Sequence, residues 1–357
     1  MKRSPRLLLA ILGVTLLLIG LAACGDDDDG RSGDAATSTE SSDGDDSRGA
    51  GGDAEDGAFP VVIEHKYGET TVDAEPERVV SVGFTDQDFL LSLGVVPVGI
   101  RDWYGDQPFA TWPWAQDALG DAEPEVLPSA ELNFEQIAAL QPDLIVGVSS
   151  GMTEEDYTTL SAIAPTVTQG DEYVDYGTPW QVGLAQIGAA VGKTATAADL
   201  IDDIEGRFAE ISESHPDFTG DVAVAYVVSA DEIGAYASSD TRSRMFTDLG
   251  FSIPAEYDEI AGDLFYANFS LEEIERIDRE LLVWIGVDPS VFDAIREHPL
   301  HDSLDVVARG AEVFMSPEHA AAAGFSSPLA LTYLLDEFVP ILEAATDDDP
   351  ATEVPVP

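Results

Sequence analysis

Two kinds of side chain in this sequence stand where a ligand could be recognised: aromatic rings and arginines. The segment 102–116, DWYGDQPFATWPWAQ, carries its aromatic residues outside any apolar periodicity, as irregular chain does. Large rings offer a bound molecule broad contact at a small entropic cost. Arginine is scarce, yet three arginines stand near the expected ends of strands: Arg101, Arg242 and Arg244. Their planar guanidinium groups suit catecholate or carboxylate oxygens.

Ligands of open α/β sheets bind beyond the carboxyl ends of the strands. This rule, together with the aromatic segment and two tyrosines of the second half, gives ten candidate ligand-binding residues: Thr85, Arg101, Trp103, Tyr104, Trp112, Ser150, Tyr236, Arg242, Arg244 and Tyr266. The aromatic residues and the arginines could each have a structural role instead of binding a ligand. The aromatic side chains could pack a proline-rich loop onto the fold, and the arginines could form surface ion pairs on a very acidic protein.

Two other kinds of site can be weighed from the residues. A bare transition-metal site needs clustered His, Asp or Cys ligands, and of the five histidines only His298 and His301 are close in sequence. Residues 147–151, GVSSG, match the G-x-S-x-G turn of serine hydrolases, but the following MTEEDY reads as the start of an acidic, solvent-facing helix. We therefore expect neither a metal ligand nor a catalytic residue.

The elements that would position the candidate residues form a repeat. LNFEQIAALQPDLIVGV, residues 132–148, returns as FSLEEIERIDRELLVWIGV, residues 269–287. Each copy predicts a helix of about three turns that leads into a buried strand. A helix end of the type Leu-Gly, with proline shortly after it, also occurs twice, at 93–97 and 249–254. With strands and helices in alternation, two similar α/β lobes with mainly parallel sheets are expected.

A proline-free stretch over 182–214 separates the two repeats and keeps apolar residues at helical spacing. It predicts a connecting helix over 181–215, with two helices and a bend near Gly192 as the alternative. The remaining organisation is an N-terminal lobe over 59–180, a C-terminal lobe over 216–346, and an acidic, proline-containing tail over 347–357.

The amino terminus reads as an export signal rather than as part of the fold. Basic residues precede an apolar run over 7–23, which is short for a membrane span and typical of a signal peptide. Small residues stand before Cys24, the only cysteine, as at the lipidation site of bacterial lipoproteins. We expect a lipoprotein signal peptide over 1–23, then lipidated Cys24 and an acidic disordered tether over 24–58. An uncleaved anchor helix is the alternative.

The formal net charge of −53 is the most unusual property of the composition. From residue 59 onward, 57 acidic residues stand against 11 basic ones, so this part alone carries −46. Such a surface repels the phosphate backbone, and nucleic acid is not expected as a partner. It is consistent with adaptation to high external salt, where screening relieves the self-repulsion.

Several short phrases, taken in their order and spacing, resemble the iron-siderophore and vitamin B12 class of ABC-transporter substrate-binding proteins. They are PERVV (76–80), LGVVPVG (93–99), QPDLI (141–145), YTTLSAIAP (157–165), HPL (298–300) and SPLA (327–330). The resemblance covers residues 60–346, and segment 102–116 is most similar to the actinobacterial iron-siderophore branch.

This resemblance implies a class III periplasmic-binding-protein fold: two Rossmann-like α/β lobes joined by a single long helix that limits hinge motion, with the ligand between them. It implies a monomeric, non-enzymatic receptor without a cofactor, lipid-anchored on the extracytoplasmic face of the cell membrane. The receptor would pass a ferric siderophore to an ABC permease and its ATPase; haem and cobalamin are alternative ligands. By motif, Glu135 and Glu272 would engage permease arginines, although a glutamate in a first turn also favours the helix dipole.

Overall fold

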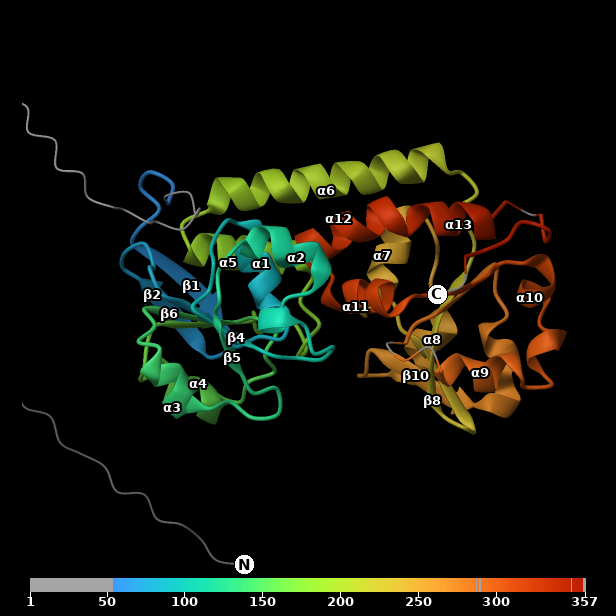
Figure 1. The fold of residues 1–357 in the computed structure, drawn as a ribbon, viewed down its shortest axis with the longest axis horizontal. Helices are drawn as coiled ribbons and strands as arrows, with labels where there is room; N and C mark the ends of the chain where they lie inside the picture. The colour runs from blue at the N-terminus through green and yellow to red at the C-terminus, as the bar shows by residue number, and fades with distance from the viewer. Residues whose placement is uncertain (1–53, 287, 289, 348, 356–357) are drawn as a thin grey trace, which may run out of the picture. The chain divides into compact units, whose positions relative to one another are not determined.

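Two separate five-stranded sheets organise the chain, one in each expected lobe (Figure 1). The computed structural model describes residues 54–286, 288, 290–347 and 349–355. The expected signal peptide over 1–23, Cys24 and most of the tether over 24–58 lie outside these residues. Within the described part of the chain, no helix has the length and apolar character needed to cross a membrane.

The sheet of the N-terminal lobe is fully parallel, in the order β5-β4-β3-β6-β7. Its strands are β3 (Val79–Ser81), β4 (Gly99–Arg101), β5 (Glu125–Leu127), β6 (Leu144–Gly147) and β7 (Thr166–Thr168). The connecting elements are α1 (Asp86–Ser92), η1 (Pro108–Ala110), α2 (Pro113–Leu119), α3 (Phe134–Ala139) and α4 (Glu154–Ser161). A hairpin of β1 (Val61–His65) and β2 (Gly68–Val72) precedes them. Most strand residues are buried, as expected where apolar cores cover both faces of a parallel sheet.

The C-terminal lobe follows the same plan with one change. Its sheet runs β10-β9-β8-β11-β12, and β9 is antiparallel to both β8 and β10. Only two residues connect β8 to β9, and such a short hairpin allows no other direction for that pair. The expected parallel arrangement therefore holds for β8, β11 and β12. The strands are β8 (Val222–Ser229), β9 (Glu232–Tyr236), β10 (Tyr266–Ser270), β11 (Leu281–Trp284) and β12 (Glu312–Phe314). The helical elements are α7 (Thr241–Leu249), α8 (Ala255–Ala261), η2 (Leu271–Ile277), α9 (Val291–Arg296), η3 (His301–Ser303), α10 (Asp305–Arg309) and α11 (Pro317–Phe325).

The repeated sequence folds twice into the same short unit. Helix α3 buries Ile137 and leads to β6, and η2 buries Ile274 and leads to β11. The predicted length of three turns is wrong, because α3 has six residues and η2 is a 3₁₀ helix of seven. In the first copy, Gln141 adopts φ 51° and Pro142 follows it, so the helix cannot continue.

The connecting segment 181–215 consists of two helices, α5 (Trp180–Ala190) and α6 (Thr194–Ser214). A continuous helix over this range is therefore wrong, and the alternative of a bend near Gly192 is confirmed. Gly192 adopts φ 70°, a conformation that glycine reaches at little cost. Of these two helices, the 21-residue α6 passes between the lobes, and it packs on α5 at one end and α7 at the other (Figure 1).

The chain ends with α12 (Pro328–Glu337) and α13 (Val339–Ala345). Although α12 lies within the range 216–346 assigned to the C-terminal lobe, it packs against α1 and α2 of the N-terminal lobe and along α6. One apolar core consequently continues beneath α6 from Leu184 in one lobe to Phe246 in the other. Separating the lobes fully would expose this core to water, so only limited relative motion is expected.

Candidate ligand-binding cavity

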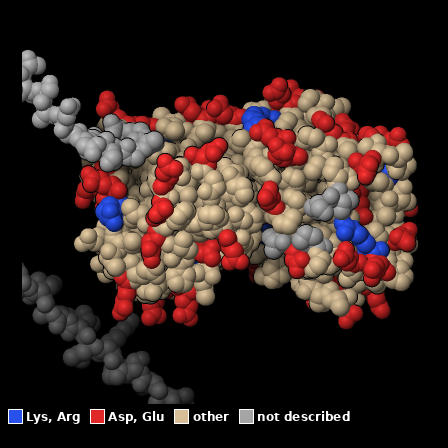
Figure 2. Space-filling view, viewed as in Figure 1, with Lys and Arg blue, Asp and Glu red and all other residues tan. Residues whose placement is uncertain are grey.

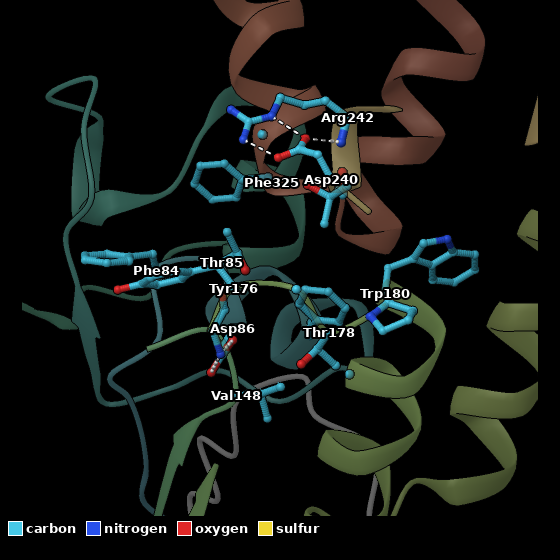
Figure 3. Close-up of a pocket in the computed structure, with 18 of the residues that line it drawn as sticks. Phe84, Thr85, Asp86, Val148, Tyr176, Thr178, Trp180, Asp240, Arg242 and Phe325 are labelled. Carbon is cyan, nitrogen blue, oxygen red and sulfur yellow. Dashed lines mark hydrogen bonds and ion pairs between the residues drawn. The ribbon is translucent and has the colours of Figure 1, made fainter. Parts of the chain in front are cut away.

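A cavity of about 210 Å³ lies between the two lobes, and both lobes contribute to its wall. The N-terminal lobe supplies the loop between β3 and α1, the residues after β6, and the chain that leads into α5. The C-terminal lobe supplies the loop between β9 and α7 and the end of α11. Figure 3 shows Asp240 and Arg242 on the opposite side of this space from Phe84, Thr85 and Asp86. The β3 and β6 loops follow carboxyl ends of parallel strands, the usual place for ligands in such sheets.

Aromatic rings form much of the wall. Phe84 stacks on Trp103 with ring centroids 5.6 Å apart and on Tyr176 at 6.1 Å. Trp103 also contacts Phe325, at 5.5 Å between centroids. Since Phe84, Trp103 and Tyr176 belong to the N-terminal lobe and Phe325 ends α11, aromatic groups from both lobes meet at the cavity. Such a surface suits a large ligand with extensive apolar area.

Arg242 is the only arginine or lysine among the described wall residues, and it is already paired. Its Nε and Nη2 donate to the Asp240 carboxylate at 2.7 and 2.8 Å, and its Nη1 donates to the Tyr236 hydroxyl at 2.9 Å. Burial lowers the pKa of Arg242, but the Asp240 carboxylate together with the hydroxyls of Tyr236 and Tyr104 raises the pKa overall, so the guanidinium stays charged. Asp240 also caps α7 through the Arg242 amide. The pair presents no net charge to the cavity.

Asp86 is the remaining carboxyl group of the wall. It is 1% exposed, and its two carboxyl oxygens accept the Ser149 amide at 3.0 and 3.3 Å. Burial raises the pKa of Asp86 to about 7, against the lowering effect of the Ser149 and Val148 amides. No basic side chain in the described part of the chain forms an ion pair with it. Near neutral pH this carboxyl therefore exists in both protonation states.

Two neutral hydrogen-bond donors of the wall have no partner among the described residues: the Thr178 hydroxyl and the indole Nε1 of Trp180. Both atoms are buried. A buried donor without an acceptor is costly. Neither atom is accessible to solvent, so both donors lie beneath the surface of the wall. The surface that the wall presents to the cavity is thus largely aromatic.

Three of the ten predicted ligand-binding residues line the cavity: Thr85, Trp103 and Arg242. The other two predicted arginines are turned to the protein itself. Arg101 Nη2 donates to the Ser129 carbonyl at 2.8 Å, and its guanidinium lies 4.1 Å from the centroid of the Phe84 ring. Arg244 Nη1 donates to the Gly177 carbonyl at 3.1 Å. Neither arginine is among the described residues of the wall.

Five more predicted residues lie behind the wall: Tyr104, Trp112, Ser150, Tyr236 and Tyr266. Tyr104 packs on Trp103 at 4.5 Å between centroids, and Tyr266 packs edge-on against Phe265, a wall residue, at 5.1 Å. The hydroxyl of Ser150 donates to a backbone carbonyl in its own turn, at 2.7 Å. These side chains support the residues that line the cavity instead of lining it themselves.

Several wall residues were not among the ten candidates: Asp86, Tyr176, Thr178, Trp180, Phe265 and Phe325. Asp86 directly follows the predicted Thr85. The strand-end rule, that ligands bind beyond the carboxyl ends of strands, therefore predicted the correct loop but not this residue. The stretch YGTPW, residues 176–180, carried an aromatic signal of its own just before the connecting segment. Phe325 stands beside the SPLA phrase, but only the folded chain brings the end of α11 to the N-terminal lobe.

Histidine takes no part in the described wall. His65, His215, His298, His301 and His319 are all described, and none lines the cavity. His301 Nε2 lies 2.9 Å from a Glu312 carboxyl oxygen instead. No group of three His, Cys, Asp or Glu side chains is arranged to hold a metal ion within the described ranges. Ser149, the residue of the G-x-S-x-G match, lines the cavity without a histidine beside it on the described wall.

Residues 79–311 match the sequence pattern of the family described as periplasmic binding protein. The chain belongs to this family. It is 28% identical over 230 residues to the probable siderophore-binding lipoprotein YfiY of Bacillus subtilis strain 168, which covers 62% of this chain and 67% of the relative. It is 26% identical over 258 residues to the Fe(3+)-citrate-binding protein YfmC of the same organism, covering 70% and 76%.

Among solved structures, the chain is similar to PiaA of Streptococcus pneumoniae TIGR4 in complex with ferrichrome. The two are 28% identical with a TM-score of 0.68, and the match covers 81% of this chain and 99% of the other. The expected fold of two α/β lobes joined by a long helix is therefore confirmed. Members of the periplasmic binding protein family are binding proteins rather than enzymes.

Proposed function

We propose that this periplasmic binding protein is the extracytoplasmic solute-binding component of an ABC importer, which captures a ferric siderophore and delivers it to the permease and its ATPase. The observation that carries the proposal is the aromatic cavity whose wall both lobes share. Relatives named for siderophore and ferric citrate binding, and a neighbour solved with ferrichrome, support this class of ligand. A siderophore supplies the oxygens that hold its iron, so the protein acts without a metal ligand, a cofactor or a catalytic residue of its own.

Capture requires the wall to move, because about 210 Å³ is less than the roughly 300–1,000 Å³ typical of small-molecule pockets. The joint between α11 and α12 is one place where the lobes can pivot. Ser326 is buried there with φ 44°, which is uncommon for serine. The neighbouring Ser327 hydroxyl donates to Asp88 of α1 at 2.8 Å and so ties the joint to the N-terminal lobe. With the core shared beneath α6, this arrangement favours a modest opening.

We assign Cys24 as the lipid-carrying residue that holds the exported protein at the outer face of the cell membrane. The described end of the tether, residues 54–58, contacts the folded chain at the start of α6. There the Glu55 carboxylate accepts the backbone amides of Ala195 and Thr196, at 2.9 Å each. These bonds lower the pKa of Glu55, so the carboxylate stays ionised at the positive end of the helix.

The permease would bind the two lobes through Glu135 and Glu272. Both side chains are exposed, in the first turns of α3 and η2. Within the described residues neither forms an ion pair, so both carboxylates are available to arginines of a partner. Their equivalent positions in the repeated unit give one contact on each lobe.

Tryptophan fluorescence tests the proposed ligand class, because Trp103 and Trp180 line the cavity. The protein is titrated with ferrichrome, ferric citrate, a ferric catecholate, haem and cobalamin. Saturable quenching by at least one ferric siderophore is expected, with a smaller amplitude in Trp103→Phe. The matched control is Trp284→Phe, in the core of the C-terminal lobe away from the wall. Saturable binding of haem or cobalamin alone would contradict the proposal.

A further inference from the structure

We infer that the cavity selects iron complexes that are electrically neutral or positively charged over complexes that are anionic. The inference rests on the proposed function and narrows it to one chemical class of siderophore. From sequence, three arginines were expected to suit catecholate or carboxylate oxygens. In the described structure Arg101 and Arg244 do not reach the wall, and Arg242 is paired with Asp240.

The charge of the wall follows from its ionisable groups. The Arg242 guanidinium and the Asp240 carboxylate cancel each other through two hydrogen bonds. Asp86 then leaves the described wall either neutral or with one negative charge. The whole chain carries −53, and acidic side chains far outnumber Lys and Arg on the face seen in Figure 2. An anionic complex would leave water for a site without a compensating cation.

The two other arginines near this site do not line the described cavity, so neither can form a direct ion pair with a ligand there. Arg101 lies against the Phe84 ring, and Phe84 is the residue that lines the cavity. Its guanidinium is held by carbonyl oxygens, among them those of Val82 and Ser129. Arg244 donates one hydrogen bond from Nη1 to the Gly177 carbonyl. Reaching a ligand would cost each arginine these hydrogen bonds.

The charge of a ferric siderophore follows from its donor groups. Each hydroxamate loses one proton, so three of them cancel the charge of Fe(III). Each catecholate loses two protons, so three catecholates leave an overall charge of 3−, and ferric citrate complexes are also anionic. A ferric trihydroxamate core has no net charge and presents methylene chains, which match the aromatic rings of the wall. A positively charged ammonium group on such a ligand would be attracted by the Asp86 carboxyl when that carboxyl is ionised.

Calorimetric titration of the folded protein with four complexes tests the inference. They are ferrichrome, which is a neutral trihydroxamate, ferrioxamine B, a cationic one, ferric enterobactin, an anionic tris-catecholate, and ferric citrate. At low ionic strength both hydroxamates should bind at least about tenfold more tightly than either anion, and salt should narrow the difference. An anionic complex that binds as tightly as the hydroxamates would overturn the inference and leave the proposed function standing. Failure of all four complexes to bind would contradict both the inference and the proposed function.

Asp240→Asn provides a second, directed test. Asparagine still caps α7, but it no longer neutralises Arg242. The affinity for ferric enterobactin relative to ferrichrome should rise at least about tenfold. Asp203→Asn makes the same change of charge on the exposed face of α6 and should leave the ratio as in the wild type. An unchanged ratio in a folded Asp240→Asn protein would overturn the inference; if that variant fails to fold, the wild-type series decides.

Discussion

Replacing Asp86 with asparagine should abolish a pH-dependent loss of stability. Burial raises the pKa of this carboxyl to about 7, from an ordinary value of 3.8. The unfolded chain ionises the group near pH 4, whereas the folded protein keeps the proton until the pH approaches 7. Between these values unfolding releases a proton, so the contribution of Asp86 to stability is greatest at low pH and is lost as the pH rises.

The magnitude follows from the difference between the two pKa values. About three pH units at ~1.4 kcal/mol each correspond to roughly 4 kcal/mol lost once the pH exceeds 7. Between pH 5 and pH 8 the contribution of Asp86 to the free energy of unfolding falls by roughly 3 kcal/mol, since the folded carboxyl ionises near pH 7. Asparagine retains an oxygen for the Ser149 amide and has no titratable proton. The Asp86→Asn protein should therefore not show this fall in unfolding free energy.

Urea unfolding of both proteins at pH 5 and pH 8 measures the effect. The unfolding free energy of the wild type should fall by roughly 3 kcal/mol more than that of Asp86→Asn. Burial also raises the pKa of Asp88 and Asp248 to about 6, but these groups are present in both proteins and cancel in the comparison. Asp203→Asn, the exposed control, should follow the wild type. Parallel pH dependences of the wild type and Asp86→Asn would refute the reasoning.

Three further changes test other parts of the structure. Glu55→Gln weakens the cap on α6 and should lower the free energy of unfolding by about 1 kcal/mol in urea, whereas an unchanged midpoint would mean that this contact does not form in solution. Trp103→Ala should weaken binding of a ferric siderophore by about tenfold in calorimetry; wild-type affinity would remove this ring from the site. Glu135→Arg and Glu272→Arg should leave that affinity unchanged but abolish cellular uptake of the iron complex, and uptake at the wild-type rate would exclude docking through these residues.

The existence and type of the main elements could be predicted because their signals are local. The buried Ile137 and Ile274 mark the same unit in both lobes, and Gly192 marks the break between α5 and α6. Element lengths depended on the backbone conformation of single residues, which apolar spacing does not reveal. An example is the positive φ at Gln141, which ends α3. The antiparallel β9 and the position of α12 depend on partners that are distant in sequence, which periodicity cannot reveal.

The candidate site was predictable in its place but only partly in its residues. The strand-end rule reached Thr85, Trp103 and Arg242 because each lies on a loop that faces the other lobe. It could not foresee where a guanidinium directs its donors. The carbonyl that holds Arg101 lies 28 residues along the chain, and the carbonyl that holds Arg244 lies 67 residues away. Burial of those arginines is a property of the tertiary structure.

The position of α12 determines when the N-terminal lobe can be completed. Because α12 (Pro328–Glu337) covers α1 and α2, residues late in the chain finish a lobe that begins at residue 59. During synthesis the apolar faces of α1 and α2 would stay uncovered until the last helices had emerged. Such a late completion of the lobe suits the export proposed above, in which the polypeptide would cross the bilayer as an extended strand and fold on the far side.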